Sequence, residues 1–224
     1  MQVSNEIDQS LLSEDKNILE KTHYETYKRI LDVFLTLLLL PLILPLILII
    51  SLLIKLDSKG KIFFSHVRIG KNGTPFKCYK FRTMVINAEE VLKDVLKDEK
   101  AKVEWGKDFK LREDPRITRI GNFLRKSSLD ELPQIFNVFQ GNMSFVGPRP
   151  ITNAEIAKYG NNFIYYKEVK PGITGIWQIS GRNDIDYDKR VNLDKQYSQS
   201  KSIREDLKII FKTIPVIFTK KGAY

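Results

Sequence analysis

The chain has 224 residues and one cysteine, so it is long enough for one compact domain with attached segments, and it excludes an internal disulfide and a cysteine-based zinc site. A formal net charge of +10 favours anionic partners such as nucleic acid, anionic lipid or phosphorylated substrates. Nucleic-acid binding would depend on this charge alone, because the sequence contains no recognition-helix motif, and we therefore expect no nucleic-acid partner.

The chain begins with a polar segment, residues 1–26, which has no clear apolar face and is expected to be a flexible lead-in. An apolar run follows, from Val33 to Ile54, which contains no charged residue and has the length of a membrane-spanning helix. A core helix of a soluble protein is the alternative, but such a helix normally carries a polar stripe. We therefore expect residues 27–56 to form a membrane helix in contact with lipid.

Two features of the apolar run favour a re-entrant helix, which enters and leaves the membrane on one face. Pro41 and Pro45 lie near the middle of the run, and each proline removes a backbone donor and bends a helix. Basic residues flank the run on both sides, and the positive-inside tendency would keep both flanks in the cytoplasm. The flanking residues are Lys28, Arg29, Lys55, Lys59 and Lys61. A helix that spans the membrane is the alternative.

The next part of the chain predicts a small β-hairpin. An Asn72-Gly73 turn signal separates two β-prone segments, residues 63–67 and 75–81. Residues 55–82 are also strongly basic. We expect most of these charges to lie on a solvated face near lipid headgroups, and a few to contact substrate phosphates.

Helical spacing of apolar residues predicts the remaining elements. The expected helices cover residues 88–105, 117–124, 132–139 and 203–219. Gly141 is expected to end the third of these helices, and Pro215 to break the last one. We expect residues 57–224 to form one domain facing the cytosol. The predicted fold class is α/β and mostly helical, with a small hairpin and a re-entrant N-terminal helix in a monotopic membrane protein.

The densest group of residues that could carry chemistry contains the adjacent carboxylates Asp130 and Glu131. Ser128 and Glu131 have the spacing of a capping box, and an N-cap at Ser128 would place both carboxylates in the first turn of a helix. A helix cap without any further function is the alternative. Pro133 would also fit a helix that begins slightly later.

Two arginines lie in loops rich in glycine and proline farther along the chain. Arg149 lies between two prolines that limit where its side chain can point, and an immobilised guanidinium suits bidentate phosphate binding. Arg182 lies in a later loop that also contains Trp177. An acidic pair near two loop arginines, on a basic domain at a membrane, indicates phosphoryl chemistry.

Five short motifs occur in the order of a known family: KRILD at residues 28–32, YKFRTM at 79–84, SLDELPQ at 128–134, GPRP at 147–150 and KPGITG at 170–175. From about Tyr27 to Tyr224 the chain resembles the bacterial sugar transferases, also called monotopic phosphoglycosyl transferases. The resemblance implies transfer of a sugar-1-phosphate from a UDP-sugar to a polyprenyl phosphate such as undecaprenyl phosphate, with release of UMP. This reaction would begin the assembly of a cell-surface polysaccharide such as an exopolysaccharide or capsule.

The resemblance also implies roles for individual residues. It makes Asp130 the nucleophile that forms a covalent phosphosugar intermediate. It makes Glu131 a ligand of Mg²⁺, the expected cofactor, with Asp130 beside it at the metal. The expected substrate-binding residues are Lys80, Arg149 and Arg182. The family's membrane helix breaks at a proline that corresponds to Pro45, and Pro41 is an additional proline.

Physical chemistry agrees with these expectations, because a divalent ion lowers the repulsion between two anionic substrates. We expect the protein at the bacterial inner membrane, with its domain on the cytoplasmic face and in contact with membrane lipid. Residues 177–184 resemble members that handle glucose or galactose more than those that handle diacetamido sugars. A non-catalytic membrane scaffold that recruits glycosyltransferases is the alternative function, and it would need no acidic pair. The sequence is compatible with a homodimer.

Overall fold

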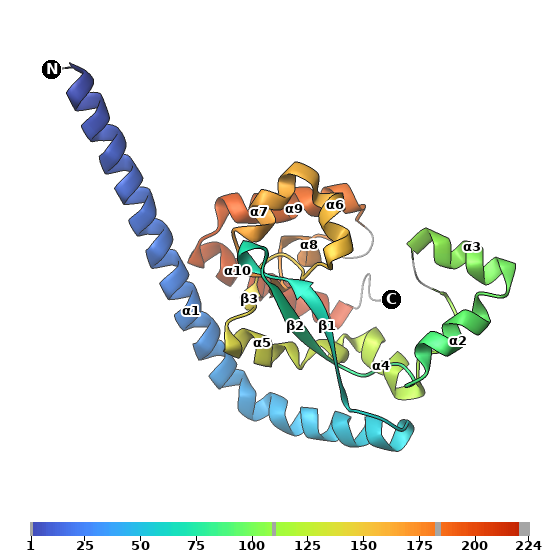
Figure 1. Cartoon of the computed structure of the whole chain (residues 1–224). Helices are drawn as coiled ribbons and strands as arrows, with labels where there is room; N and C mark the ends of the chain where they lie inside the picture. The colour runs from blue at the N-terminus through green and yellow to red at the C-terminus, as the bar shows by residue number, and fades with distance from the viewer. Residues whose placement is uncertain (1, 109–110, 182–184, 220–224) are drawn as a thin grey trace.

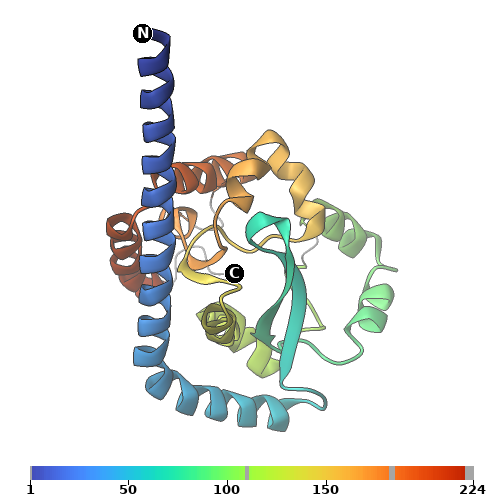
Figure 2. The ribbon, with the colours of Figure 1, turned by 60° about the vertical axis from the view of Figure 1, so that its left-hand side comes forward.

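The longest element of the structure, a computed structural model, is the helix α1 (Gln2–Asp57). The structure describes residues 2–108, 111–181 and 185–219. Figures 1 and 2 show that α1 runs along one side of the other elements, bends, and then passes below them. Pro41 and Pro45 both lie inside the helix. A proline removes one backbone hydrogen bond and crowds the preceding turn, so it can bend a helix without ending it.

The structure differs from one expectation for this part of the chain. The lead-in expected over residues 1–26 is helical from Gln2 onward, and the segment contains neither glycine nor proline to interrupt a helix. At Pro45, where the family resemblance places a break, the residues stay helical within a helix that is bent as a whole (Figure 1). A membrane-helix break at Pro45 and a re-entrant path through a membrane stay predictions.

The apolar half of α1 is largely uncovered by the rest of the protein. Among the described residues, one helix, Thr22–Asp57, is long and apolar enough to cross a membrane, judged by length and composition. Only 17% of its most apolar window is buried, whereas the core helix of a soluble protein would be mostly buried. Leu42 and Leu48 are 74% and 70% exposed. The structure therefore argues against a soluble core helix.

A buried ion pair joins α1 to the last helix, α10 (Ile203–Thr219). Lys28 Nζ lies 2.8 Å from Asp206 Oδ2, and the two side chains are only 7% and 1% exposed. Tyr197 adds a hydroxyl that accepts from Lys28 and donates to Asp206. Because each charge has its partner inside the protein, this contact fixes one face of α1 to the domain.

The next residues of the KRILD motif dock α1 on two further elements. Arg29 donates two hydrogen bonds of 2.7 Å to carbonyl oxygens in the last turn of α5 (Gln134–Gln140). Asp32 accepts hydrogen bonds of 2.9 and 3.0 Å from a hydroxyl and a backbone N–H of β3 (Ser144–Val146). The motif thus attaches the anchor helix to the domain.

The second half of α1 packs against the domain through aliphatic side chains. Ile47, Ile50 and Ile54 form a buried cluster with Phe81 and Leu124. Through this cluster the apolar run contributes to the hydrophobic core of the domain. The exposed side chains of the same run lie outside it.

The predicted hairpin is confirmed. Strands β1 (Phe63–Ile69) and β2 (Pro75–Phe81) pair antiparallel, with Phe64 opposite Lys80. Asn72 has a left-handed φ of 59° in the connecting turn, which suits asparagine better than most residues.

Some charges of residues 55–82 have structural partners and do not lie on a solvated face. Arg82 donates to the carbonyl oxygens of Ser58, at 2.9 Å, and of Lys59, which follow the end of α1. Lys71 forms an ion pair of 2.8 Å with Glu25 of α1. Part of the basic stretch therefore holds α1 and the hairpin together.

The remaining elements surround the hairpin and α5, as Figure 2 shows. Before β3 they are α2 (Ala88–Val95), α3 (Glu99–Asp108), α4 (Arg119–Ser127) and the 3₁₀ turn η2 (Leu129–Glu131). A second strand pair joins β3 in parallel to β4 (Gly172–Thr174). The other helices are η3 (Asn153–Glu155), α6 (Ile156–Tyr159), η4 (Gly160–Asn162), α7 (Phe163–Lys167), α8 (Ile176–Ile179) and α9 (Tyr187–Ser200).

The mostly helical class with a small hairpin is confirmed, and the end of α5 at Gly141 agrees with the prediction. The single helix expected over residues 88–105 is wrong, because Asp98 accepts a hydrogen bond from the Ala101 N–H and begins a new helix, α3. The break expected at Pro215 is also wrong, since α10 continues through it.

We predict that Lys28→Met destabilises the protein by about 3 kcal/mol, because Asp206 would keep hydroxyl partners but lose its buried cation. Thermal unfolding of the full chain in detergent measures the change. The control is Lys102→Met, which removes an exposed ion pair with Glu99 and should change stability by less than about 1 kcal/mol. Equal unfolding temperatures for the two variants would contradict the role of Lys28.

Candidate active site

The two candidate carboxylates lie on η2, between α4 and α5. Ser128 ends α4 with a left-handed φ of 57°, an uncommon conformation for a residue with a side chain. The predicted capping box is wrong, because Ser128 makes no side-chain cap hydrogen bond and α5 begins only after Pro133. Asp130 and Glu131 therefore lie on a sharp turn that precedes α5, and not in the first turn of the helix.

Apolar packing holds this turn against the hydrophobic core. Leu129 and Leu132 flank the two carboxylates, and both pack against the buried cluster that Ile47, Ile50 and Ile54 of α1 form with side chains of β2 and α4. The carboxylates therefore lie beside a part of the core that α1 shares with these two elements. Side chains packed in this cluster cannot shift without opening the core.

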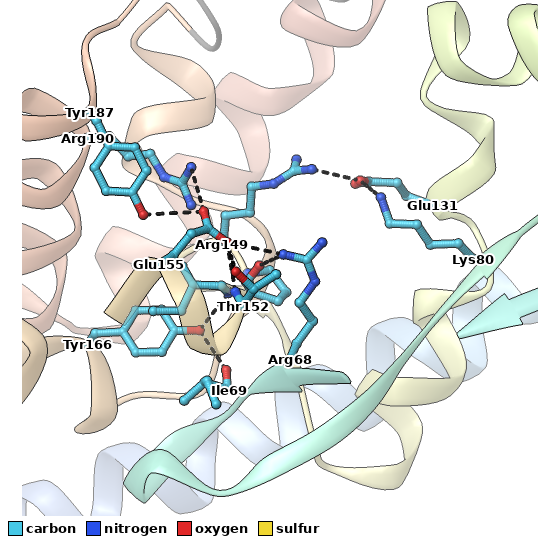
Figure 3. A network of polar contacts seen from close by, with 12 residues as sticks. Arg68, Ile69, Lys80, Glu131, Arg149, Thr152, Glu155, Tyr166, Tyr187 and Arg190 are labelled. Carbon is cyan, nitrogen blue, oxygen red and sulfur yellow. Dashed lines mark hydrogen bonds and ion pairs between the residues drawn. The ribbon is translucent and has the colours of Figure 1, made fainter. Parts of the chain in front are cut away.

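Two cations from other elements meet the carboxylates, and Figure 3 shows their contacts with Glu131. Lys80 Nζ, on β2, lies 2.6 Å from Glu131 Oε1 and 3.7 Å from Asp130 Oδ2. Arg149 Nη2 lies 3.5 Å from the same Glu131 oxygen. The structure therefore brings together four of the predicted site residues. Arg182 lies outside the described residues.

The two adjacent carboxyl groups have pKa values shifted in opposite directions. Burial raises the pKa of Asp130, and Lys80 and Arg125 offset this only in part. Burial acts in the same way on Glu131, but Arg149 and Lys80 outweigh it and lower its pKa to about 2. Glu131 is thus held as a carboxylate by its cations, while the charge on Asp130 is poorly compensated. Such a pair suits a division of roles between the two groups.

Close backbone contact shapes the loop that carries Arg149. A side chain on Gly147 would lie 2.2 Å from the Lys170 carbonyl oxygen, and one on Gly172 would lie 2.1 Å from the Gly147 nitrogen. Gly172 N also donates to Pro148 O at 2.7 Å. The GPRP and KPGITG motifs therefore contain glycine because their backbones cross at this point.

A second polar cluster lies beside Arg149 and was missed by the sequence analysis. Arg68 Nη1 lies 3.4 Å from Glu155 Oε2, and Arg190 approaches the other oxygen of Glu155 at 4.0 Å. Burial and the nearby charge of Arg149 lower the pKa of Arg68. One signal was present in the sequence, because Thr152 and Glu155 have capping-box spacing, and the structure contains this box.

The cluster also joins the hairpin to the Arg149 loop. Arg68 Nη1 donates to Pro150 O at 3.2 Å, and Ile69 N donates to Ile151 O at 2.9 Å. Tyr166 bridges the same two segments, since its hydroxyl donates to Ile69 O and accepts from Ile151 N. Lys80 and Arg149 therefore reach Glu131 from segments that are fixed to each other.

The donor set fits Mg²⁺, although the metal itself stays an expectation. Asp130 and Glu131 are partly open to solvent, with side chains 14% and 23% exposed. Among the described residues no group of three or more His, Cys, Asp or Glu residues could hold a metal. The other ligands would thus be water and phosphate oxygens, which Mg²⁺ accepts readily beside one or two carboxylates.

Comparison with known proteins gives a consistent result. A family model described as bacterial sugar transferase matches residues 23–220. The exopolysaccharide production protein ExoY of Sinorhizobium fredii is 47% identical over 198 residues, which are 88% of this chain and 88% of ExoY.

Two longer relatives carry names that state an activity. The undecaprenyl-phosphate galactose phosphotransferase of Salmonella typhimurium is 46% identical over 210 residues, or 93% of this chain and 44% of the relative. The UDP-glucose:undecaprenyl-phosphate glucose-1-phosphate transferase of Escherichia coli is 40% identical over 205 residues, or 88% and 41%. The chain spans less than half the length of these two relatives.

We predict opposite stability changes for two isosteric variants, measured by thermal unfolding at pH 7 in metal-free buffer. Asp130→Asn should raise the unfolding temperature, because a carboxyl group with a raised pKa costs stability once it is ionised. Glu131→Gln should lower it by a few degrees, at about 2–4 °C per kcal/mol.

The pH dependence provides the control for this prediction. The stabilisation by Glu131 is fully present above its usual pKa of 4.5 and is lost as the pH falls towards about 2. The difference between wild type and Glu131→Gln should therefore shrink below pH 4.5. Shifts of the same sign for both variants at pH 7 would show that the two carboxyl groups share one environment.

Proposed function

The chain belongs to the bacterial sugar transferase family, and we propose that it transfers a hexose-1-phosphate from a UDP-sugar to undecaprenyl phosphate at a membrane surface. The observation that carries the proposal is the carboxylate pair Asp130 and Glu131, which is contacted by two cations and lies beside a core cluster to which the apolar helix α1 contributes. The cations suit the phosphates of the donor. The helix suits a lipid-linked acceptor.

In the first step, a carboxylate oxygen of Asp130 attacks the phosphorus next to the sugar. A bond from Asp130 to phosphorus forms, the diphosphate P–O bond breaks, and UMP leaves with the electron pair. The poorly compensated charge on Asp130 supports this role, because a carboxylate that is weakly stabilised gains from forming a bond. Lys80 and Arg149 bind the phosphate oxygens during the step.

In the second step, a phosphate oxygen of undecaprenyl phosphate attacks the same phosphorus. A new diphosphate bond forms, the acyl phosphate bond to Asp130 breaks, and the carboxylate is regenerated. No proton has to be supplied for this exchange, since both attacking groups are anions. Dividing the transfer in two keeps the two anionic substrates from having to bind together.

Glu131 is the first candidate for a Mg²⁺ ligand, with Asp130 beside it. A bound Mg²⁺ would supply compensation for the charge of the diphosphate and of the departing UMP. Lys80 and Arg149 hold Glu131 in the structure, so we propose that they turn to the donor phosphates once the metal binds.

The acceptor suggests how the protein lies at the membrane. We propose that α1 enters and leaves the inner membrane on the cytoplasmic face, which would hold Asp130 at the height of a lipid phosphate. The packing of Leu129 and Leu132 against the core cluster that contains the buried isoleucines of α1 supports this height. The basic residues that flank the helix support its placement on the cytoplasmic face.

The names of the relatives support glucose or galactose as the sugar, since both occur among them. A scaffold without catalytic activity would need none of the contacts around Asp130 and Glu131. Their presence favours the transferase. Detection of a covalent intermediate on Asp130 would distinguish the transferase from a scaffold, because a scaffold forms none.

We predict that the full chain releases UMP from UDP-glucose or UDP-galactose when undecaprenyl phosphate is present, and that Asp130→Asn lowers the rate by about 1,000-fold or more because the nucleophile is lost. Wild type incubated with donor alone should retain labelled sugar phosphate, and hydroxylamine should release it as expected for an acyl phosphate.

The matched control is Asp94→Asn on α2, an aspartate that is 73% exposed, and it should keep full activity and labelling. Full activity of Asp130→Asn would exclude the covalent route. Absence of UMP release by wild type with every sugar in a panel of UDP-sugars would exclude the transferase.

We predict that cysteines placed on both sides of the apolar run react only from the cytoplasmic face, as a re-entrant helix requires. Ser13→Cys and Lys59→Cys are suitable positions, and the native Cys78 is only 2% exposed, so background labelling should be low. The measurement is labelling of intact cells against opened cells with a membrane-impermeant maleimide. Labelling of position 13 in intact cells would indicate a helix that spans the membrane.

A further inference from the structure

The charges at the candidate site leave room for another cation. Among the described residues, Lys80 and Arg149 form ion pairs with the carboxylates Asp130 and Glu131, so these four charges balance. The diphosphate of a nucleotide sugar brings further negative charge. If the proposed function holds, a bound Mg²⁺ would compensate part of this charge, and a further cationic side chain beside Arg149 would compensate more.

Arg68 has the position that such a side chain would need. It is 20% exposed, and its charge acts on both Glu131 and Arg149. Figure 3 shows Arg149 extending towards Glu131, while Arg68 rises from β1 and ends with its guanidinium close to Arg149. The bond to Pro150 O and the contact with Glu155 both use Nη1 of Arg68, so its Nη2 edge is directed elsewhere.

The structure holds Arg68 firmly, although it lies near a like charge. Pro150, whose carbonyl oxygen accepts from Arg68, is the residue next to Arg149, so this bond keeps Arg68 beside the loop that carries Arg149. Glu155 is itself fixed, because both the N–H and the hydroxyl of Thr152 donate to it, at 2.8 and 2.9 Å. Two arginines held together against their repulsion are a site prepared for an anion.

We propose that Arg68 is a second guanidinium of the donor site, which forms with Arg149 a two-arginine clamp on the diphosphate of the nucleotide sugar. This inference rests on the proposed function and adds a substrate-binding residue to it. The alternative is that Arg68 only joins the hairpin to the Arg149 loop.

Binding of UDP and of uridine by the full chain in detergent, at constant Mg²⁺, separates these two roles. Arg68→Gln keeps an N–H donor for Pro150 O but removes the charge. We expect it to weaken UDP binding by about 10- to 100-fold, as for loss of a charge-assisted hydrogen bond, and to leave uridine binding unchanged. The KM for the UDP-sugar should rise more than kcat falls. The control variant Arg112→Gln, at an exposed arginine, should leave the affinities for UDP and for uridine unchanged.

A second variant keeps the test decisive if Arg68→Gln proves too unstable to fold. Arg68→Lys keeps the charge and the aliphatic part of the side chain but cannot present two parallel N–H donors, so it should fold and still bind UDP more weakly than wild type. Unchanged UDP affinity in either folded variant, or an equal loss of UDP and uridine affinity, would overturn the clamp. If the wild-type protein itself neither binds UDP nor releases UMP, the proposed function fails. The clamp fails alone if the wild-type protein does both and the Arg68 variants bind UDP normally.

Discussion

The buried cluster that α1 shares with β2 and α4 is the constraint on which the rest of the site depends. Leu129 and Leu132, on the two sides of the carboxylates, pack against this cluster, to which α1 contributes Ile47, Ile50 and Ile54. Other apolar side chains of the same helix are exposed. The turn and α1 are therefore parts of one packed unit. A rotation of α1 would disturb the core that also supports the turn, because packed side chains resist such shifts.

The charges around that turn are arranged so that two neighbouring carboxylates differ. Glu131 receives Lys80 and Arg149, whereas Asp130 is buried with weaker compensation. The contrast arises from distance, since Lys80 lies closer to Glu131 than to Asp130 and the ion pair of Arg149 is with Glu131. The same geometry would let one group attack phosphorus while the other holds a metal, as the proposed mechanism requires.

Sequence predicted the parts of the fold that local rules control. The Asn72-Gly73 signal and the stop at Gly141 depend on residues that are close in the chain, and both agree with the structure. The capping box at Ser128 failed because α4 reaches this residue and ends on it in a left-handed conformation. Lys80, Arg149 and the carboxylates were found by motif. Arg68 was not, because its partner Glu155 lies 87 residues away and only the fold brings them together.

The docking of α1 has a consequence for the order in which the protein can be made. Lys28, Arg29 and Asp32 leave the ribosome before their partners, which lie more than 100 residues later in the chain. During synthesis these polar groups must therefore stay solvated until the later segments appear. The domain then closes onto a helix that has already been made, so these long-range contacts are among the last to form.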